Sequence, residues 1–267
     1  TVTYVIEEGP LYRVSDIEIR GNEVISGEDL YGSLEMTADE PFSPSGLQRD
    51  IGAIRDAYGL MGYIDAAVRP VTVIDEKEPL VAISYNVEEG YPVYVNEIAI
   101  IGNDKTRDNV IRREIELTPT ELFNTAAMRE SRKNLDRLGY FSKVDMTTEK
   151  TAFPDRRDAV VEVEETPTGQ LLLGVAVTSD SGLSGQIVFR QRNFDYRNPP
   201  SSWRDLAEGR AWVGGGQTFE LDARPGTEFT RFAINYRDPH FDDSPYSFGL
   251  SAQRWEREWD SYMETRT

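Results

Sequence analysis

The chain has 267 residues, with 29 Lys and Arg against 47 Asp and Glu, a single His and no Cys, and its formal net charge is −18. The lack of cysteine excludes a disulfide scaffold, a thiolate metal site and a cysteine nucleophile, and the single histidine excludes a multi-histidine metal centre. The acidic balance offers no basic footprint, so no nucleic-acid partner is expected. No apolar run approaches the roughly 18 residues of a transmembrane helix, but membrane β-strands stay possible because their signal is alternation.

Charge divides the chain into two parts. Residues 1–166 hold 18 Lys and Arg and 33 Asp and Glu, a net charge of −15, whereas residues 167–267 hold 11 Arg, no Lys and 14 Asp and Glu, a net charge of −3. We interpret the break near residues 166–169 as a domain boundary. The acidic first part favours solubility and argues against docking on anionic lipid.

The first part contains an internal repeat with an offset of 81 residues. Residues 4–22 and 85–103 are identical at nine of 19 positions, including a Glu-Glu-Gly run and a final Gly-Asn pair. Such self-similarity indicates repeated structural units. It predicts modules at 10–90 and 91–166. Residues 1–9 match the last strand of a further copy, so the chain is expected to begin inside a longer array.

The first module is predicted to have the order β-α-α-β-β. Alternating Val and Ile mark a strand that ends at the Gly-Asn pair 21–22. A short helix capped near Ser26 follows, and Ser43 with the next proline is a typical start for a longer helix. Strands at about 64–74 and 80–88 then form a hairpin across a charged turn.

The second module follows the same pattern. Its first strand ends at the Gly-Asn pair 102–103, and its short helix is expected to be capped near Thr106. Asn124 is predicted to cap the longer helix. Strands at about 143–150 and 159–165 close the module. In both modules the hairpin strand that follows the long helix is expected at a sheet edge.

These modules resemble polypeptide-transport-associated (POTRA) domains. The resemblance rests on the Ile-x-Ile-x-Gly-Asn strand, on long helices that end in Gly-Tyr pairs at 62–63 and 139–140, and on the Val-Glu-Glu-Gly end of the last strand at 87–90. It covers residues 1–166 and implies an α+β fold for each repeat.

The remaining residues, 167–267, alternate apolar and polar side chains in about five segments. Each segment has about ten residues, which is the length of a tilted membrane β-strand, and aromatic residues cluster towards the segment ends, as in interfacial girdles. A water-soluble antiparallel sandwich also alternates and stays open as an alternative. The connector at 194–214 is unusually long, with serines at 201–202 that are expected to cap a short helix, and the sequence assigns it no role.

The order of the two modules and the following strands is similar to that of the BamA-type family of outer-membrane protein assembly factors. The match includes Gly-Gln-Leu at 169–171, Gln-Arg-Asn-Phe at 191–194 and Pro-Gly-Thr-Glu-Phe at 225–229. The resemblance implies periplasmic POTRA domains followed by the first strands of a transmembrane β-barrel, in the cell outer membrane. The family's lid loop and closing strand would lie beyond residue 267, so the chain is expected to be truncated. Implied partners are unfolded outer-membrane proteins, outer-membrane lipid and accessory lipoproteins.

No pattern in the sequence supports an enzyme, a metal site or a cofactor. His240 lies at a strand end and is more typical of a satisfied or solvent-facing residue than of a catalytic one. The glycines at 214–216 precede a strand and not a helix, so they lack the context of a phosphate-binding loop. The paired glutamates at 7–8, 88–89 and 164–165 recur at module ends and are interpreted as solvated strand termini.

The edge strands are the predicted functional surface. Unpaired N–H and C=O groups on a sheet edge can accept an extended client peptide by β-augmentation. By resemblance, the first barrel strand also forms a lateral gate where a client strand pairs. The small residues of this strand are consistent with weak packing at the gate, and equally with side chains that face the interior of the barrel. The predicted client edges are Ile64, Ala66, Val68, Val71, Val73, Val144, Met146 and Thr148, and the gate strand is Leu171, Leu172, Leu173, Gly174, Val175, Ala176 and Val177.

The leading hypothesis is a non-enzymatic factor that assembles and inserts outer-membrane β-barrel proteins. One alternative is a two-partner-secretion transporter, against which the partial extra strand at 1–9 argues. A second alternative is a soluble periplasmic POTRA scaffold, which would show no detergent dependence.

Overall fold

The computed structural model describes residues 10–178, 182–259 and 262–266. The strand expected at 1–9 lies outside the described residues. The chain divides into two compact units, one of residues 1–99, 117–130 and 147–159 and the other of residues 100–116, 131–146 and 160–267, so the division passes through the second module. Among the described residues, no helix is long and apolar enough to cross a membrane.

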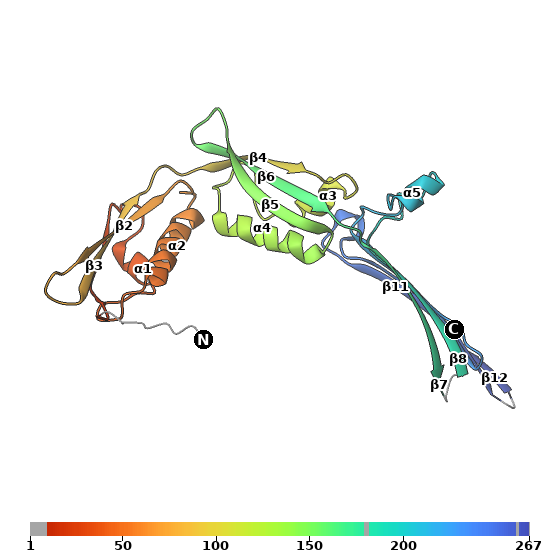
Figure 1. Cartoon of the computed structure of the whole chain (residues 1–267). Coiled ribbons are helices and arrows are strands. Elements are labelled where there is room, and N and C mark those ends of the chain that lie inside the picture. The colour runs from red at the N-terminus through yellow and green to blue at the C-terminus, as the bar shows by residue number, and fades with distance from the viewer. Residues whose placement is uncertain (1–9, 179–181, 260–261, 267) are drawn as a thin grey trace. The chain divides into compact units, whose positions relative to one another are not determined.

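The first module has the predicted β-α-α-β-β order. It comprises β1 (Arg13–Arg20), α1 (Gly27–Tyr31), α2 (Pro44–Leu60), β2 (Ala67–Ile74) and β3 (Leu80–Glu88). The sheet order is β1-β3-β2, with β1 parallel and β2 antiparallel to β3. Both helices belong to the crossover between the two parallel strands, and Figure 1 shows them together beside the sheet.

Local side-chain chemistry explains the helix starts. The Ser26 side chain accepts a hydrogen bond from the amide of Asp29, and the Ser43 side chain accepts one from the amide of Gly46, 3.2 Å in each case. Each bond satisfies an amide that the first helical turn leaves without a partner. Both predicted caps are confirmed.

The core of the first module contains one buried polar pair. Asp50 on α2 and Tyr85 on β3 are both fully buried, and the Tyr85 hydroxyl donates to the Asp50 carboxylate at 2.7 Å. The same carboxylate accepts the amide of Glu35 at 2.7 Å. At the repeat offset of 81, Asp50 corresponds to Ser131, whose hydroxyl accepts the amide of Glu116 at 2.8 Å. The second module thus keeps this backbone contact with a neutral side chain.

The second module comprises β4 (Tyr94–Ile101), α3 (Asp108–Arg112), α4 (Thr125–Leu138), β5 (Phe141–Lys150) and β6 (Arg156–Glu165), with the sheet order β4-β6-β5. Asn124 caps α4 as predicted, because its side-chain oxygen accepts the amides of Ala126 and Ala127. The predicted cap near Thr106 is wrong. Arg107 stands at that position without a side-chain capping bond, since the Thr106 hydroxyl has another partner.

The C-terminal part forms one antiparallel sheet. Its strands are β7 (Gly169–Thr178), β8 (Gly182–Phe194), β9 (Gln217–Arg224), β10 (Phe229–Asp238), β11 (Phe248–Trp259) and β12 (Tyr262–Arg266), paired in sequential order. The sequence predicted about five strands, and the described part contains six. The additional strand, β12, has only five residues, which is too short to show an alternation. Between β8 and β9, Ser202 caps the short helix α5 (Trp203–Ala207), as expected.

The register gathers the apolar side chains on one face of this sheet, here called the apolar face. Leu173 lies opposite Ile187 and Leu221 lies opposite Ile234. Val175 is 81% exposed, so in the described part no second sheet covers this face. That exposure contradicts the sandwich alternative, in which such residues would be buried. The opposite face is polar and carries an ion pair between Arg190 and Glu220 at 2.7 Å.

Candidate functional site: open strand edges and the joint between module and sheet

The edge strands lie where the sequence placed them, but β2 contains fewer of the predicted residues. β2 and β5 each stand at the edge of their sheets. β2 begins at Ala67, so Ile64 and Ala66 precede the strand, and Ala66 is buried. The inclusion of these two residues was wrong. The chain needs them to turn after the helix, where the amide of Ala66 donates to the carbonyl of Tyr63.

Side-chain alternation limits what the edge residues can contact. In β2, Val71 and Val73 are exposed and Val68 is half-buried. In β5, Thr148 is exposed, but Val144 and Met146 are buried in the core of the module. Because successive side chains of a strand point to opposite faces, those two side chains face the core, and only the backbone groups of the two residues are available at the strand edge.

The two edges differ in their supply of N–H groups. Pro70 lies in the middle of β2, opposite Tyr85 of β3. Proline has no N–H group, and it is one of the devices that blunt an edge strand. β5 is ten residues long and contains no proline. Every residue of β5 therefore has a backbone N–H group, whereas β2 lacks one at Pro70.

The predicted gate strand stands at the edge of the C-terminal sheet. β7 pairs with β8 from Gly169 to Thr178, and in the described part β8 is its single partner. Leu171, Leu172, Leu173, Val175 and Val177 are all more than half exposed. A Cβ atom at Gly174 would meet only the side chain of Gln186, at 3.7 Å and beyond, so packing in this structure does not require glycine there.

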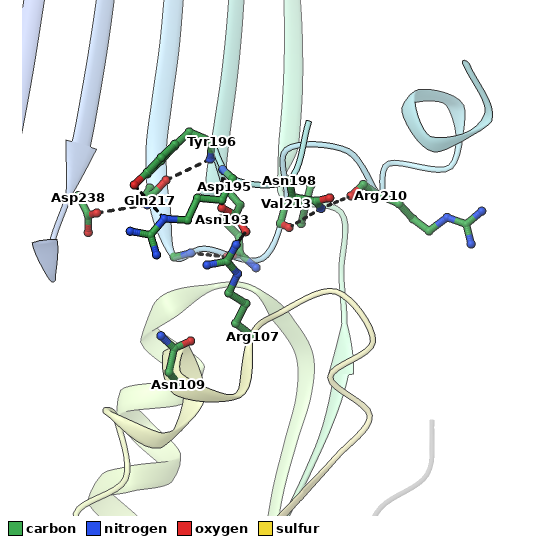
Figure 2. Close-up of polar contacts among 12 residues, drawn as sticks. Arg107, Asn109, Asn193, Asp195, Tyr196, Asn198, Arg210, Val213, Gln217 and Asp238 are labelled. Carbon is green, nitrogen blue, oxygen red and sulfur yellow. Dashed lines mark hydrogen bonds and ion pairs between the residues drawn. The ribbon is translucent and has the colours of Figure 1, made fainter. Parts of the chain in front are cut away.

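A polar joint connects the second module to the base of the sheet. We define the joint as residues 105–109, which form the loop before α3 and its first two residues, together with residues 192–195 and 213–216, all within one compact unit. At its centre is Asn193, which is 1% exposed. Its side-chain amide donates to the Thr106 hydroxyl at 2.9 Å, and its side-chain oxygen accepts the amide of Gly216 at 2.8 Å. Figure 2 shows Asn193 between the loop and the strands.

An ion pair reinforces the joint. Arg107 contacts the carboxylate of Asp195 at 2.5 Å, and the Asp195 side chain is 2% exposed (Figure 2). The Arg107 amide also donates to the carbonyl of Gly214 at 3.0 Å. A buried carboxylate without a partner is costly. Moving Arg107 away would leave the buried Asp195 carboxylate without this ion pair, so the pair keeps Arg107 in place.

A tyrosine at the start of β5 adds a third contact. The Tyr140 hydroxyl lies 3.2 Å from the carbonyls of both Arg192 and Gly216 and donates to them. Burial raises the pKa of Tyr140 to about 12, although the nearby Arg113 and Arg192 oppose this shift. The hydroxyl therefore stays protonated and remains a donor at neutral pH. It fixes the first residues of β5 against the base of β8 and β9.

Glycine makes the close approach of the two segments 105–113 and 214–216 possible. Gly214 has φ +113°, and a Cβ atom there would lie 2.0 Å from the carbonyl oxygen of Lys105. Gly216 has φ +74°, and its Cβ atom would lie 2.4 Å from the Arg113 guanidinium. The run 214–216 is thus a backbone-to-backbone docking element and precedes a strand, as predicted.

Two of the paired glutamates are structural ligands of backbone amides. Glu165 accepts the amides of Lys105 and Thr106, and so shapes the loop that enters the joint. Glu89 accepts the amides of Glu23 and Val24 and the Tyr58 hydroxyl. The interpretation as solvated termini was therefore wrong for these two residues. Glu8 lies outside the described residues.

A second turn of the sheet also reaches the second module. The Asn109 side chain donates to the carboxylate of Asp243 at 2.6 Å. Asp242 and Asp243 have φ near +54° and +55°, a conformation that L-residues other than Asn and Asp seldom adopt. His240, in the same turn, is half-buried, and its Nδ1 atom is buried without a hydrogen-bond partner among the described residues.

The joint was not predicted, but the repeat in the sequence carries a signal for it. At the offset of 81, Ile25, Ser26 and Glu28 of the first module correspond to Thr106, Arg107 and Asn109 of the second. These three exchanged positions are among the residues that contact the sheet. A difference between two otherwise similar copies therefore marks the copy that docks.

Comparison with known proteins agrees with this architecture. The POTRA family model, described as a surface antigen variable number repeat, matches residues 12–90 and 93–166. An outer membrane protein assembly factor BamA from Nitratidesulfovibrio vulgaris is 28% identical over 257 residues, which cover 94% of this chain and 30% of that protein. BamA from Neisseria meningitidis serogroup B is 27% identical over 252 residues, which cover 93% of this chain and 29% of that protein. The chain thus spans about 30% of the length of these curated relatives.

Solved structures show the same fold. The crystal structure of BamA from Haemophilus ducreyi lacking POTRA domains 1–3 is similar with a TM-score of 0.77 and 24% identity, and covers 94% of this chain and 44% of that chain. The Haemophilus influenzae BamA POTRA3–5 structure has a TM-score of 0.55 and 25% identity, and covers 58% of this chain and 61% of that chain.

Fold and joint together define a class of protein in which tandem POTRA modules are joined to an antiparallel sheet of the outer-membrane barrel type. The chain belongs to the BamA-type family of outer-membrane protein assembly factors, with its POTRA modules in the periplasm and its location in the outer membrane.

Proposed function

We propose that the chain takes part in the assembly of β-barrel proteins in the outer membrane, and that it acts without enzymatic chemistry by pairing its open strand edges with unfolded client strands. The observation that carries the proposal is β7, which stands at a sheet edge with one partner strand in the described part and with exposed side chains along its length. Backbone pairing depends little on sequence, and this suits a protein that handles many clients.

The β5 edge and the β7 edge are linked through the joint. β5 begins one residue after Tyr140, whose hydroxyl bonds to the base of the sheet. β7 begins at Gly169, four residues after the end of β6 at Glu165. A client strand bound at β5 would therefore be held beside the start of β7. Outer-membrane lipid and accessory lipoproteins are further proposed partners.

Site-specific photocrosslinking tests this proposal. A photoreactive residue placed at Thr148 on β5 or at Leu173 on β7 should form adducts with an unfolded outer-membrane protein in the intact assembly factor. Tyr91, which is 80% exposed and lies outside the strands, is the matched control. Equal adduct yields at all three positions would contradict pairing at the edges.

A further inference from the structure

The start of β7 and the connector enclose a groove to which the function above gives no role. Its cavity of about 530 Å³ is lined by residues 166–171, by Phe189 of β8, and by the connector residues Leu206, Ala207 and Trp212. Figure 1 shows α5 near the end of the sheet where β7 begins. We propose that this groove binds one phospholipid molecule, with an acyl chain in the cavity and the phosphate beside Lys105.

The groove is continuous with the apolar face of the sheet. Leu171 lies opposite Phe189, and Phe189 lies opposite Leu221, so two of the groove's apolar walls belong to that face. In an outer-membrane sheet the apolar face contacts lipid. An acyl chain can therefore pass from the bilayer into the groove without crossing a polar surface.

Backbone strain at the groove supports a binding role. Trp212 has φ +54°, a left-handed conformation that is unfavourable for a bulky residue. Two hydrogen bonds hold it there. Its amide donates to the carbonyl of Asn198 at 2.7 Å, and its carbonyl accepts the amide of Asp195 at 3.0 Å. The fold thus keeps a strained tryptophan at the groove wall, and strain of this kind is concentrated at functional sites.

The connector has the side chains of a membrane interface. Trp203 on α5 is 87% exposed, and Leu206, one turn further on, is 39% exposed. Tryptophan is enriched where apolar and polar regions of a membrane meet, because its ring is apolar and its N–H group can reach water. α5 is held in shape by Ser201 and Ser202, whose hydroxyls contact the Asp205 carboxylate and amide respectively.

The polar end of the groove carries one charge of each sign. Lys105 and Glu208 both line the cavity. The Lys105 backbone is fixed by the Glu165 carboxylate, and its exposed side chain makes no ion pair among the described residues. Glu208 already pairs with Arg204 and Arg210. A lipid phosphate is therefore the charge-matched partner of Lys105.

The geometry favours a lipid over a peptide. A client strand would pair along the β7 backbone, in the plane of the sheet. The groove is instead lined by Leu171 and Phe189 of the apolar face and by Leu206 of the connector. Its occupant needs apolar length and one phosphate, and does not need backbone hydrogen bonds. This inference rests on the sheet's place in the outer membrane and is independent of client pairing.

Native mass spectrometry of the intact protein, titrated with palmitoyl-oleoyl-phosphatidylethanolamine, tests the proposal. One lipid should be retained. Ala207→Trp, which fills the groove, should weaken retention about tenfold or more, a loss of about 1.4 kcal/mol, and Lys105→Gln should weaken it several-fold. Lys143→Gln, at an exposed lysine of β5 outside the groove lining, is the control for the lost charge and should leave retention unchanged.

A second measurement does not depend on retention in detergent. Phospholipid with bromine on its acyl chain should quench the fluorescence of the protein in vesicles, and Trp212→Phe should remove part of that quenching. Retention that Ala207→Trp does not change, or quenching that Trp212→Phe does not change, would overturn the proposal. Displacement of the lipid by a client-derived peptide would show instead that the groove binds peptide.

The same variants separate this inference from the proposed function. If Ala207→Trp loses the lipid while crosslinking at Leu173 persists, client pairing stands and the groove is a lipid site. If crosslinking fails in the unmodified protein while the lipid is retained, the groove stands and the proposed function fails.

Discussion

The side-chain amide of Asn193 donates a 2.9 Å hydrogen bond to the hydroxyl of Thr106, a residue 87 positions earlier in the chain. Both residues are buried, at 1% and 2% exposure. Their contact joins a loop of the last POTRA module to the end of β8. Around it, Gly214 and Gly216 are oriented by the carbonyl and the side chain of Asn193. One asparagine therefore organises both sides of the joint.

The first prediction concerns this asparagine. Asn193→Ala should leave the buried amide of Gly216 without a partner, at a cost of about 1–3 kcal/mol. Hydrogen exchange of the Gly216 amide should then become about tenfold faster or more. Thr106→Val removes only the partner of the Asn193 amide and should have a smaller effect. Thr147→Val, at an exposed site on β5, is the control, and equal exchange in all three variants would contradict the role of Asn193.

The second prediction uses a matched pair of glycines. Gly214 and Gly209 both have positive φ, but a Cβ atom at Gly214 meets the Lys105 carbonyl at 2.0 Å, whereas one at Gly209 meets nothing within 4 Å. Each alanine variant carries the backbone cost of about 1 kcal/mol. Only Gly214→Ala should also break the hydrogen bond from the Arg107 amide, with faster exchange of that amide. The same exchange rate in both variants would show that close approach is not required.

Sequence alone predicted the features that depend on neighbouring residues. Ser43 and Asn124 were identified as caps because a cap contacts amides two or three positions later. The alternation after residue 168 was visible because a strand has a period of two. Thr106 was assigned wrongly, since its partner lies 87 positions away on the sheet. Ile64 and Ala66 were wrongly assigned to the edge strand for a similar reason, because the turn after α2 decides where β2 begins.

The groove and the joint also could not be predicted from local sequence patterns. The connector that holds Trp212 was recognised only as a long loop with a capped helix. Its conformation depends on Asn198, whose side-chain amide donates to the carbonyls of Arg210 and Val213 (Figure 2). No spacing rule connects an asparagine to carbonyls 12 and 15 residues away.

The third prediction concerns the buried pair of the first module. Asp50→Ala should leave the Tyr85 hydroxyl and the Glu35 amide without their shared acceptor, at about 1–3 kcal/mol for each group. Asp56→Ala, on the exposed side of the same helix, removes a surface ion pair with Arg129 and should cost less than about 1 kcal/mol. Urea unfolding followed through exchange of the β3 amides measures both. Similar losses in the two variants would contradict the importance of the buried pair.

The fourth prediction is a pH dependence that originates at Glu89. Partial burial disfavours its charged form, but hydrogen bonds from Tyr58 and from the amides of Val24 and Glu23 outweigh this and hold the pKa of Glu89 below its ordinary value. A lowered pKa in the folded state means that this group contributes stability above its unfolded pKa of about 4.3. That contribution is lost as the pH falls through the lower, folded-state pKa.

Glu89→Gln should therefore reduce the stability of the first module at pH 7 and flatten its dependence on pH below about 4.5. The neighbouring Glu88 is the control, because its carboxylate pairs with Arg69 at the surface and an exposed pair contributes little. Unfolding midpoints measured between pH 3 and pH 7 compare Glu89→Gln with Glu88→Gln. Only Glu89→Gln should lose the acid-dependent part of the stability, because the three donors to Glu89 come from the loop and the helix that it holds together. The same pH profile in both variants would contradict a specific role for Glu89.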